Sequence, residues 1–242
     1  MLKVRNVSKS FGDITALADV SFDVKDGEFV FIMGPSGAGK TTLLKLILKE
    51  ITPDSGKIIF EDKDIGALKA KEIPSFRQSI GVVFQDYKIL PERTLWENVE
   101  VALAVIGLPQ KEWQERVEHV LKLVGLAERA SLFPSQLSGG EVQRATLARA
   151  LVINPKIILA DEPTGNLDWG TADGIMALFE KINKEGKTIL MATHNQQIVD
   201  KLGKRVIELK EGKVVSKEKL FEEKPKKEET KDKKMKVKVE EV

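Results

Sequence analysis

Residues 34–41 read Gly34-Pro35-Ser36-Gly37-Ala38-Gly39-Lys40-Thr41, which is the pattern G-x-x-x-x-G-K-[ST]. The octapeptide follows an apolar run, Phe29 to Met33, and leads through Thr42 into a stretch with helical spacing. A strand that enters a glycine-rich turn and then a helix directs main-chain N–H groups and the positive helix end at one point. The sequence therefore predicts a site for the phosphates of a nucleoside triphosphate such as ATP. The alternative, a glycine turn with a surface lysine, does not explain this strand–turn–helix context.

Within this segment two side chains have predicted roles of their own. Lys40 is expected to reach the β- and γ-phosphates, and the Thr41 hydroxyl to ligate Mg²⁺. The predicted ATP-binding set in this stretch is Gly34, Pro35, Ser36, Gly37, Ala38, Gly39, Lys40, Thr41 and Thr42.

Composition sets limits on the class of protein. The 242 residues are 42% hydrophobic and 31% charged, as in ordinary globular proteins. A net charge of +2 is too small to favour nucleic acid as a partner, and without cysteine there is no disulfide or thiolate metal site. The N-terminus lacks the apolar segment of a secretory signal, and no run approaches the ~20 apolar residues that span a bilayer. A role at a membrane is therefore expected to depend on a partner.

Apolar periodicity divides the chain into parts. Short apolar or alternating runs predict strands at 2–7, 18–24, 29–33, 57–60, 81–84, 157–160 and 189–192, and a strand–turn–strand unit at 205–216. Between about 87 and 150 the spacing becomes helical, and the apolar window 101–108 is expected to form a buried helix. We therefore expect an α/β nucleotide-binding domain over 1–221 with an inserted helical subdomain.

From 222 to 242 the chain is rich in lysine and glutamate and has few apolar residues. Such a segment cannot offset the entropy of ordering by burying apolar surface, so a disordered, solvated tail is expected. A lysine-rich arm beside anionic lipid is the alternative, which the interleaved acidic residues weaken.

Two carboxylates follow the apolar run 157–160. Asp161 is predicted to hold Mg²⁺, as a Walker B aspartate does. Glu162 would point to the opposite side in an extended chain, toward an attacking water for which it would act as general base. The alternative is a pair of acids that merely ends a strand before Pro163.

The segment Leu137-Ser138-Gly139-Gly140-Glu141 has two explanations. Ser138 with Glu141 three residues later forms a capping box, which is enough to start a helix. Two glycines in a first helical turn are poor helix formers, however, and bare N–H groups beside a serine hydroxyl can bind a γ-phosphate.

This segment, placed shortly before a Walker B strand, resembles the signature of the ATP-binding cassette (ABC) ATPase family, over about residues 2–215. The resemblance implies a P-loop NTPase fold with a RecA-like core, an antiparallel β subdomain and the helical subdomain. It also implies an ATPase in which Gln85 contacts Mg²⁺ and water, His194 is the switch histidine, and Phe11 and Ala16 contact the nucleotide. Catalysis would then rest on Glu162, His194, Gln85 and Lys40, and Mg²⁺ binding on Thr41, Gln85 and Asp161.

The same resemblance implies that two cassettes pair head to tail. Ser138, Gly139, Gly140, Glu141 and the D-loop residue Asp168 would then bind the ATP held by the other copy. This chain departs from the family pattern at Asn195, where an aspartate is usual, at Phe11, where tyrosine is commoner, and at Trp169-Gly170. Phe11 also has a plain alternative role in the core, and His194 could be incidental.

The stretches 81–99, 133–137 and 160–168 resemble the FtsE/LolD/MacB group of that family, and most of all its FtsE cell-division ATPases. That implies a cassette at the cytoplasmic face of the cell membrane, bound to an FtsX-like integral membrane protein and linked indirectly to peptidoglycan hydrolases. The predicted groove for this partner consists of Ile89, Leu90, Leu95 and Trp96. The alternative is a LolD/MacB-type lipoprotein-release or efflux ATPase. A cassette protein of translation or DNA repair and an inactive scaffold fit less well.

Overall fold

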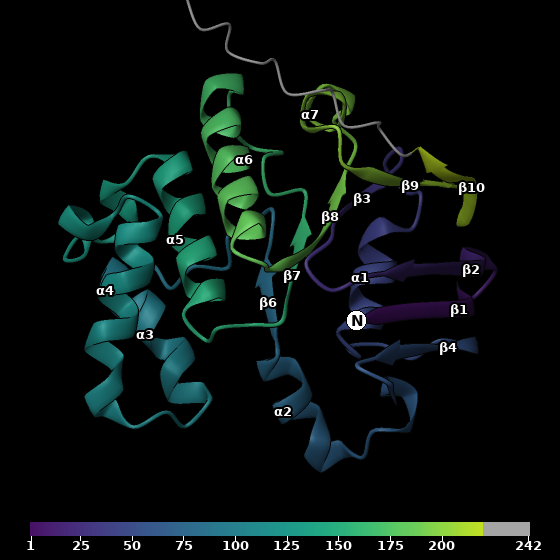
Figure 1. Ribbon diagram of the computed structural model, residues 1–242, viewed down its shortest axis with the longest axis horizontal. Helices are drawn as coiled ribbons and strands as arrows, with labels where there is room; N and C mark the ends of the chain where they lie inside the picture. Colours follow the sequence, from purple (N-terminus) through teal and green to yellow (C-terminus); the bar gives the residue numbers. More distant parts are fainter. Residues whose placement is uncertain (220–242) are drawn as a thin grey trace, which may run out of the picture.

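The computed structural model of the protein describes residues 1–219 (Figure 1). The charged tail predicted from residue 222 lies outside the described residues. The strands are β1 Leu2–Phe11, β2 Ile14–Val24, β3 Phe29–Met33, β4 Ser55–Phe60, β5 Lys63–Asp64, β6 Ile80–Val83, β7 Ile157–Asp161, β8 Thr188–Thr193, β9 Arg205–Lys210 and β10 Lys213–Lys219. The helices are α1 Lys40–Ile47, α2 Ile73–Gln78, α3 Leu95–Val105, α4 Trp113–Leu123, α5 Gly139–Leu151, α6 Trp169–Lys184 and α7 Gln196–Leu202. Short 3₁₀ turns lie at Ile65–Ala67, Ala70–Glu72, Gln110–Glu112, Ala127–Arg129 and Pro134–Gln136.

A six-stranded sheet forms the centre, in the order β10-β9-β3-β8-β7-β6, with all pairs parallel except the hairpin β9–β10. The inner strands are buried on both faces, which explains their continuous apolar runs. In β3, for example, Phe29 and Phe31 enter one hydrophobic cluster while Val30 and Ile32 enter the other. Strand alternation thus divides the core into two layers.

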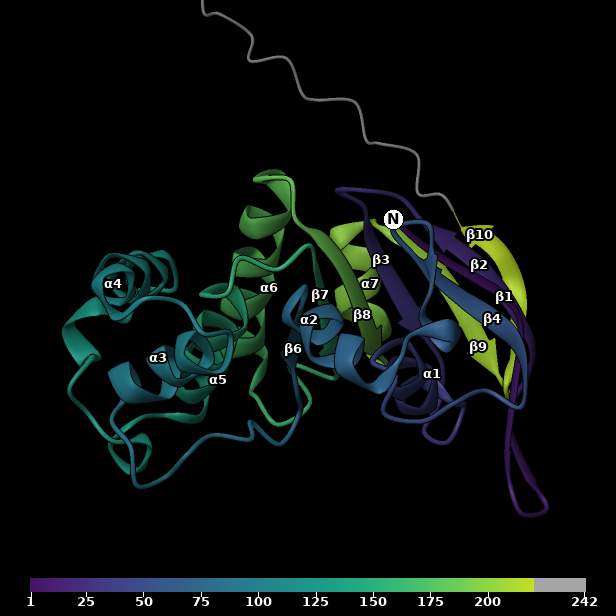
Figure 2. The same ribbon diagram turned by 90° about the horizontal axis from the view of Figure 1, so that it is seen from below.

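One layer holds α1 between the central sheet and a four-stranded antiparallel sheet, in the order β2-β1-β4-β5. The other face of the central sheet carries α3 to α7, and α3 to α6 lie at the side of the molecule opposite to the antiparallel sheet (Figure 2). The fold is therefore the expected α/β cassette with a RecA-like core, an antiparallel β part and a helical part.

The helices α3, α4 and α5 lie together at the end of the molecule next to β6 (Figure 1). The apolar window 101–108 is helical through Val105, but the expectation that it is buried is wrong. Leu103 is buried, whereas Ala104 is exposed and the Val105 side chain is 74% exposed. Within residues 1–219 no helix is long and apolar enough to cross a membrane.

Candidate functional site

The glycine-rich loop joins β3 to α1 and is pressed against the antiparallel part of the fold. Gly39 has φ +102°, and a Cβ there would lie 2.5 Å from the carbonyl oxygen of Ala16. Gly34 is equally constrained, because its Cβ would lie 2.2 Å from the carbonyl oxygen of Leu209. Only glycine therefore fits these two positions. No side chain caps the start of α1, so its first N–H groups remain suited to an anion.

Lys40 is buried at the first position of α1. Its Nζ donates to the carbonyl oxygens of Gly34 at 2.7 Å and Pro35 at 3.1 Å, and lies 3.2 Å from Oε1 of Glu162. The loop thus curls around its own lysine, and the ammonium group lies between the phosphate-binding turn and the predicted base.

Thr41 and Asp161 meet across the gap between α1 and the end of β7. The Thr41 hydroxyl donates to Oδ2 of Asp161 at 2.9 Å, while the other carboxylate oxygen, Oδ1, is buried with no partner in the described structure. Burial raises the pKa of Asp161. An unpaired buried carboxylate oxygen beside a hydroxyl matches the oxygen ligands that Mg²⁺ prefers, so these residues fit that ion.

Glu162 does not continue the strand as an extended residue, which corrects the expectation from strand alternation. It has φ 48°, a left-handed conformation that is costly for a side-chain-bearing residue. Its N–H still pairs with the Ala192 carbonyl at 2.9 Å, and its own carbonyl accepts from Gly165 at 3.0 Å. The turn, rather than strand alternation, directs the carboxylate toward Lys40.

His194 lies just beyond β8 and completes this cluster. Its Nδ1 lies 2.5 Å from Oε2 of Glu162, and its side chain is 61% exposed whereas that of Glu162 is 14% exposed. The glutamate is therefore held from both sides, by an ammonium group on one oxygen and by an imidazole on the other. A histidine in this position can orient the carboxylate.

Gln85 follows β6 and faces the loop after β7. Asn166 Nδ2 donates to the main-chain oxygen of Gln85 at 3.1 Å, and the two side chains approach at 3.5 Å. Gln85, Thr41, Asp161 and Asn166 line the same groove of about 640 Å³. The glutamine thus lies at the Mg²⁺ side of the site, although no direct bond to Thr41 or Asp161 forms.

Phe11 and Ala16 belong to the β1–β2 hairpin. Phe11 is 49% exposed, with the Lys9 ammonium 5.5 Å from its ring centroid, so the alternative role in the core is wrong. The Ala16 carbonyl adjoins the loop at Gly39. Ala16 thus lies beside the phosphate-binding turn, and Phe11 presents an exposed ring at the end of the same hairpin.

The signature residues lie elsewhere. Ser138 caps α5, with its N–H and hydroxyl donating to Glu141 Oε2 at 2.9 and 2.8 Å, and these bonds lower the pKa of Glu141. The helix α5 packs into the hydrophobic cluster on the face of the central sheet opposite to α1 (Figure 1). The chain therefore does not bring its own signature to its own Lys40.

Packing explains part of the double glycine. A Cβ on Gly140 would lie 2.2 Å from Cγ2 of Thr171, so α6 requires glycine there. A Cβ on Gly139 would lie only 3.3 Å from the Tyr87 hydroxyl, and Gly139 is itself exposed. Packing against Thr171 accounts for the glycine at position 140, so anion binding is needed as an explanation only for the glycine at position 139.

Asp168 caps α6, accepting from Thr171 N at 3.0 Å and Thr171 Oγ1 at 2.6 Å, which lowers its pKa. The loop 162–168 runs from the cluster around Glu162, past Gln85, to α6, whose Thr171 packs against Gly140 at the start of α5.

Four residues were predicted to form a groove for a partner, and for Leu95 this prediction is wrong. It is fully buried in the core and cannot line an open surface. Ile89 and Trp96 are half-buried against the same core, with Trp96 Nε1 donating to Glu100 at 2.8 Å, and Leu90 is exposed. A predominantly apolar groove of about 480 Å³ lies close by instead. Its lining includes Ile80, Val82, Val101, Val105, Ile106 and Ile153.

Sequence reasoning missed two polar residues that fix the segment after Gln85. Arg149 of α5 donates to the carbonyl oxygens of Tyr87 at 3.0 Å and Lys88 at 2.8 Å, two successive residues with positive φ. Asn98 of α3 is buried and bonds both the N–H and the carbonyl of Leu90. A lone asparagine among the apolar residues of α3 is the signal that could have found Asn98, whereas no comparable local signal exists for Arg149.

Comparison with known proteins agrees with this geometry. The family described as ABC transporter matches residues 17–165. Cell division ATP-binding protein FtsE of Bacillus subtilis is 48% identical over 216 residues, which are 89% of this chain and 95% of that protein. The dimeric cassette MJ0796 has 40% identity and a TM-score of 0.82, covering 92% of this chain and 99% of that chain.

A second structure of MJ0796, dimeric and bound to ADP and Pi after hydrolysis, has 39% identity, a TM-score of 0.81 and the same coverage. The site of this chain has three features besides these similarities: a glycine-rich loop that holds Lys40, a Thr41–Asp161 pair, and a glutamate just after β7. The chain belongs to the ABC transporter family and is an ATP-binding, ATP-hydrolysing cassette.

Proposed function

We propose that this cassette is the ATPase subunit of a cell-division complex, in which ATP-driven pairing of two copies acts on an FtsX-like integral membrane protein. The observation that carries the catalytic part is the contact of Glu162 with both Lys40 and His194, beside the Thr41–Asp161 pair. The FtsE relatives support the biological role, because their name assigns them to cell division.

In the proposed reaction the main-chain N–H groups of residues 34–41 and the Lys40 ammonium bind the phosphates of ATP. Mg²⁺, when bound by Thr41, Asp161 and Gln85, would supply positive charge that offsets the charge developing on the phosphates. Glu162 then takes a proton from the attacking water, and His194 holds the glutamate in position. Phe11 stacks on the adenine ring of ATP, and Ala16 borders the pocket that holds this ring.

The position of the signature supports pairing of two copies. Ser138, Gly139, Gly140 and Glu141 belong to a helix on the face of the central sheet opposite to α1, so in this proposal a second chain supplies them to each ATP. The dimeric MJ0796 structures support such an arrangement. We include Asp168 in this interface, since the loop that it ends leads from Glu162 to α6, whose Thr171 packs against Gly140 of the signature helix.

The membrane partner is proposed to dock in the apolar groove between α2, β6, α3 and α5, extended by the exposed Leu90. Its strand β6 leads directly to Gln85, and Arg149 on its wall holds the segment after Gln85. Binding of the membrane partner in this groove would therefore affect the position of Gln85 at the nucleotide site. The cassette would lie at the cytoplasmic face of the membrane, and its cycle would reach peptidoglycan hydrolases through the partner.

The proposal is tested by tagging the chain in its native cell, solubilising membranes gently and identifying the co-purified membrane protein. An FtsX-like protein is expected, recovered with wild type and lost with a charged substitution in the groove. A permease of a lipoprotein-release or efflux system would contradict the cell-division role while leaving the ATPase assignment intact.

A further inference from the structure

Gln143 lies in the second turn of α5, and its side chain is 1% exposed. Its Oε1 accepts from the Thr146 hydroxyl at 3.3 Å, but Nε2 is buried and has no hydrogen-bond partner among the described residues. A buried donor without a partner is costly, because it has lost its bonds to water and gained none in the protein. Oδ1 of Asp161 is in the same condition and fits a bound Mg²⁺ ion. The free amide of Gln143 likewise indicates a bond that is made in another state of the protein.

The amide faces the start of the signature helix. Gln143 shares one face of α5 with Gly139 and Gly140, which precede it by one turn. A Cβ on Gly139 would lie 3.6 Å from the Leu167 side chain, and one on Gly140 would lie 2.2 Å from that of Thr171. Helical side chains lean toward the N-terminus of their helix, so the amide of Gln143 extends toward these two glycines. It therefore lies where the signature turn meets the loop after β7 and the first turn of α6.

Packing alone does not explain a glutamine at this position. Its neighbours on α5 include the buried apolar residues Val142, Ala145 and Leu147, and an apolar side chain of similar volume would leave no unpaired group. Thr146 is the other buried polar side chain of this helix, and its hydroxyl donates to the main-chain oxygen of Gln143 at 2.8 Å. The helix thus pairs one buried hydroxyl within itself and leaves one buried amide unpaired.

We propose that Gln143 is a positioning residue for ATP hydrolysis, whose Nε2 donates to a main-chain carbonyl oxygen of the loop 162–168 in the ATP-bound state. This loop is the partner because its Leu167 adjoins the same face of α5 and because it begins at Glu162. The bond fixes the signature turn relative to the base. The inference rests on the proposed role of the signature in ATP binding, and it adds a residue outside the nucleotide site on which that role depends.

The first test replaces the amide in the full-length protein by an apolar group of the same shape. Gln143→Met should raise Tm by about 2–4 °C, because no unpaired donor remains buried. It should also lower kcat about tenfold with KM unchanged, because the phosphate-binding loop is intact while the signature turn is no longer fixed. Gln143→Leu, which also lacks a donor, should show the same two changes. A residue with only a structural role would not move Tm and kcat in this way.

Thr146→Val is the matched control, since it removes a buried hydroxyl whose bond is already made within α5. Its kcat should equal that of wild type, and its Tm should not rise.

Proton exchange of the Gln143 side-chain amide, measured by NMR, is the direct readout. The parent is full-length Glu162→Gln protein, in which ATP is expected to persist, and the resonance is assigned by its loss when Gln143→Met is added. Exchange should slow at least about tenfold when MgATP is added, because the amide then forms a hydrogen bond.

An unchanged kcat in both Gln143 variants, or amide exchange that MgATP does not slow, would overturn the inference. Loss of both stability and activity in the two variants supports the inference only if exchange slows with MgATP, and overturns it otherwise. A Ser138→Ala protein with the kcat of wild type would show that the signature has no role in hydrolysis. The proposed role of the signature would then fail, and this inference would fail with it.

Discussion

His194 Nδ1 lies 2.5 Å from Glu162 Oε2, so an exposed imidazole holds a mostly buried carboxylate at the end of β7. The contact is made possible by the left-handed conformation of Glu162, which turns the side chain out of the strand direction. Lys40 contacts the other oxygen of the same carboxylate. Hydrolysis is therefore expected to depend on how well these two groups position Glu162.

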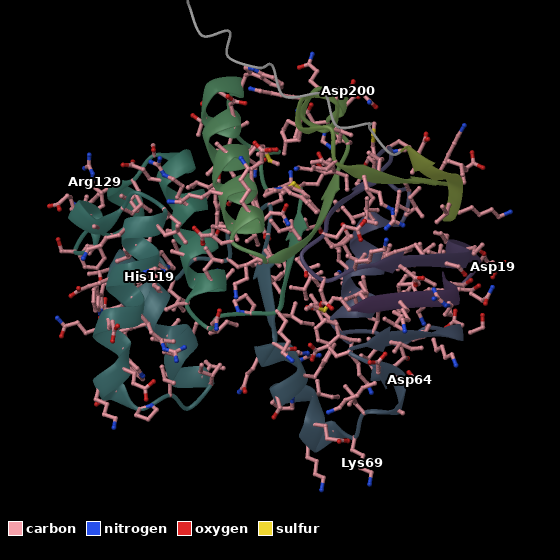
Figure 3. All side chains as sticks on the ribbon, viewed as in Figure 1. Asp19, Asp64, Lys69, His119, Arg129 and Asp200 are labelled. Atoms are coloured by element: carbon pink, nitrogen blue, oxygen red, sulfur yellow. The ribbon has the colours of Figure 1, made fainter. Side chains whose placement is uncertain are left out.

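Replacing His194 by alanine should lower kcat about 100-fold with little change in KM, because the base loses its orientation while the phosphate-binding loop is intact. His119→Ala is the control, since the other histidine lies on α4, in the helical part (Figure 3). Steady-state ATPase assays check both variants. A kcat of the His194→Ala protein equal to that of wild type would show that the contact between His194 and Glu162 has no catalytic role.

Asp161→Asn should make the protein more stable but inactive. Burial raises the pKa of Asp161, so the folded protein keeps this proton at pH values at which the unfolded chain has released it. Stability of the wild type therefore falls as pH rises through the window between the unfolded and the raised folded pKa. The asparagine variant avoids this loss and should have the higher Tm above that window.

The difference in Tm between Asp161→Asn and wild type should shrink as pH falls below the raised pKa, and thermal scans over a pH series measure it. Asp200→Asn, at an exposed position on α7, should show no such trend. A difference that is constant with pH, or a less stable asparagine variant, would refute the assignment.

Arg149→Ala should destabilise the fold by about 2 kcal/mol, because it leaves the Tyr87 and Lys88 carbonyls without their donor. Burial also lowers the pKa of Arg149, which marks how far this guanidinium is desolvated. Arg116→Ala removes only an exposed ion pair with Glu112, at 3.6 Å, and should cost under about 0.5 kcal/mol. Urea unfolding compares the two, and equal losses would mean that Arg149 does not hold the segment.

Val105→Asp should weaken binding of the membrane partner at least about tenfold, since it places a charge in an apolar groove. The variant should keep the Tm of wild type because Val105 is exposed. Val215→Asp provides a control at another exposed valine, on β10. Partner binding that survives Val105→Asp would move the docking surface away from α3.

The phosphate site was largely predictable from sequence because it depends on local patterns. The turn 34–41 and the acids after β7 each follow a short buried strand, and parallel strands bring such ends to one edge of the sheet. Packing between distant segments was not predictable. The exposure of Val105, the burial of Leu95 and the closeness of Thr171 to Gly140 depend on how α3, α5 and α6 pack.

The conformation of Glu162 was also beyond sequence reasoning. The prediction of where the Glu162 carboxylate points assumed that the strand continues in an extended conformation. Glu162 instead has a left-handed conformation, so alternation does not apply to it. The role of Arg149 depends on two residues more than 60 positions away in sequence. No local pattern contains such a contact.

The most direct test of the proposed mechanism is the Glu162→Gln protein with MgATP. We predict that hydrolysis slows at least about 100-fold, that ATP binding remains, and that a long-lived dimer with two trapped ATP molecules appears in light scattering. Hydrolysis near the wild-type rate, with no stable dimer, would contradict both the assignment of Glu162 as the base and the pairing of two copies around ATP.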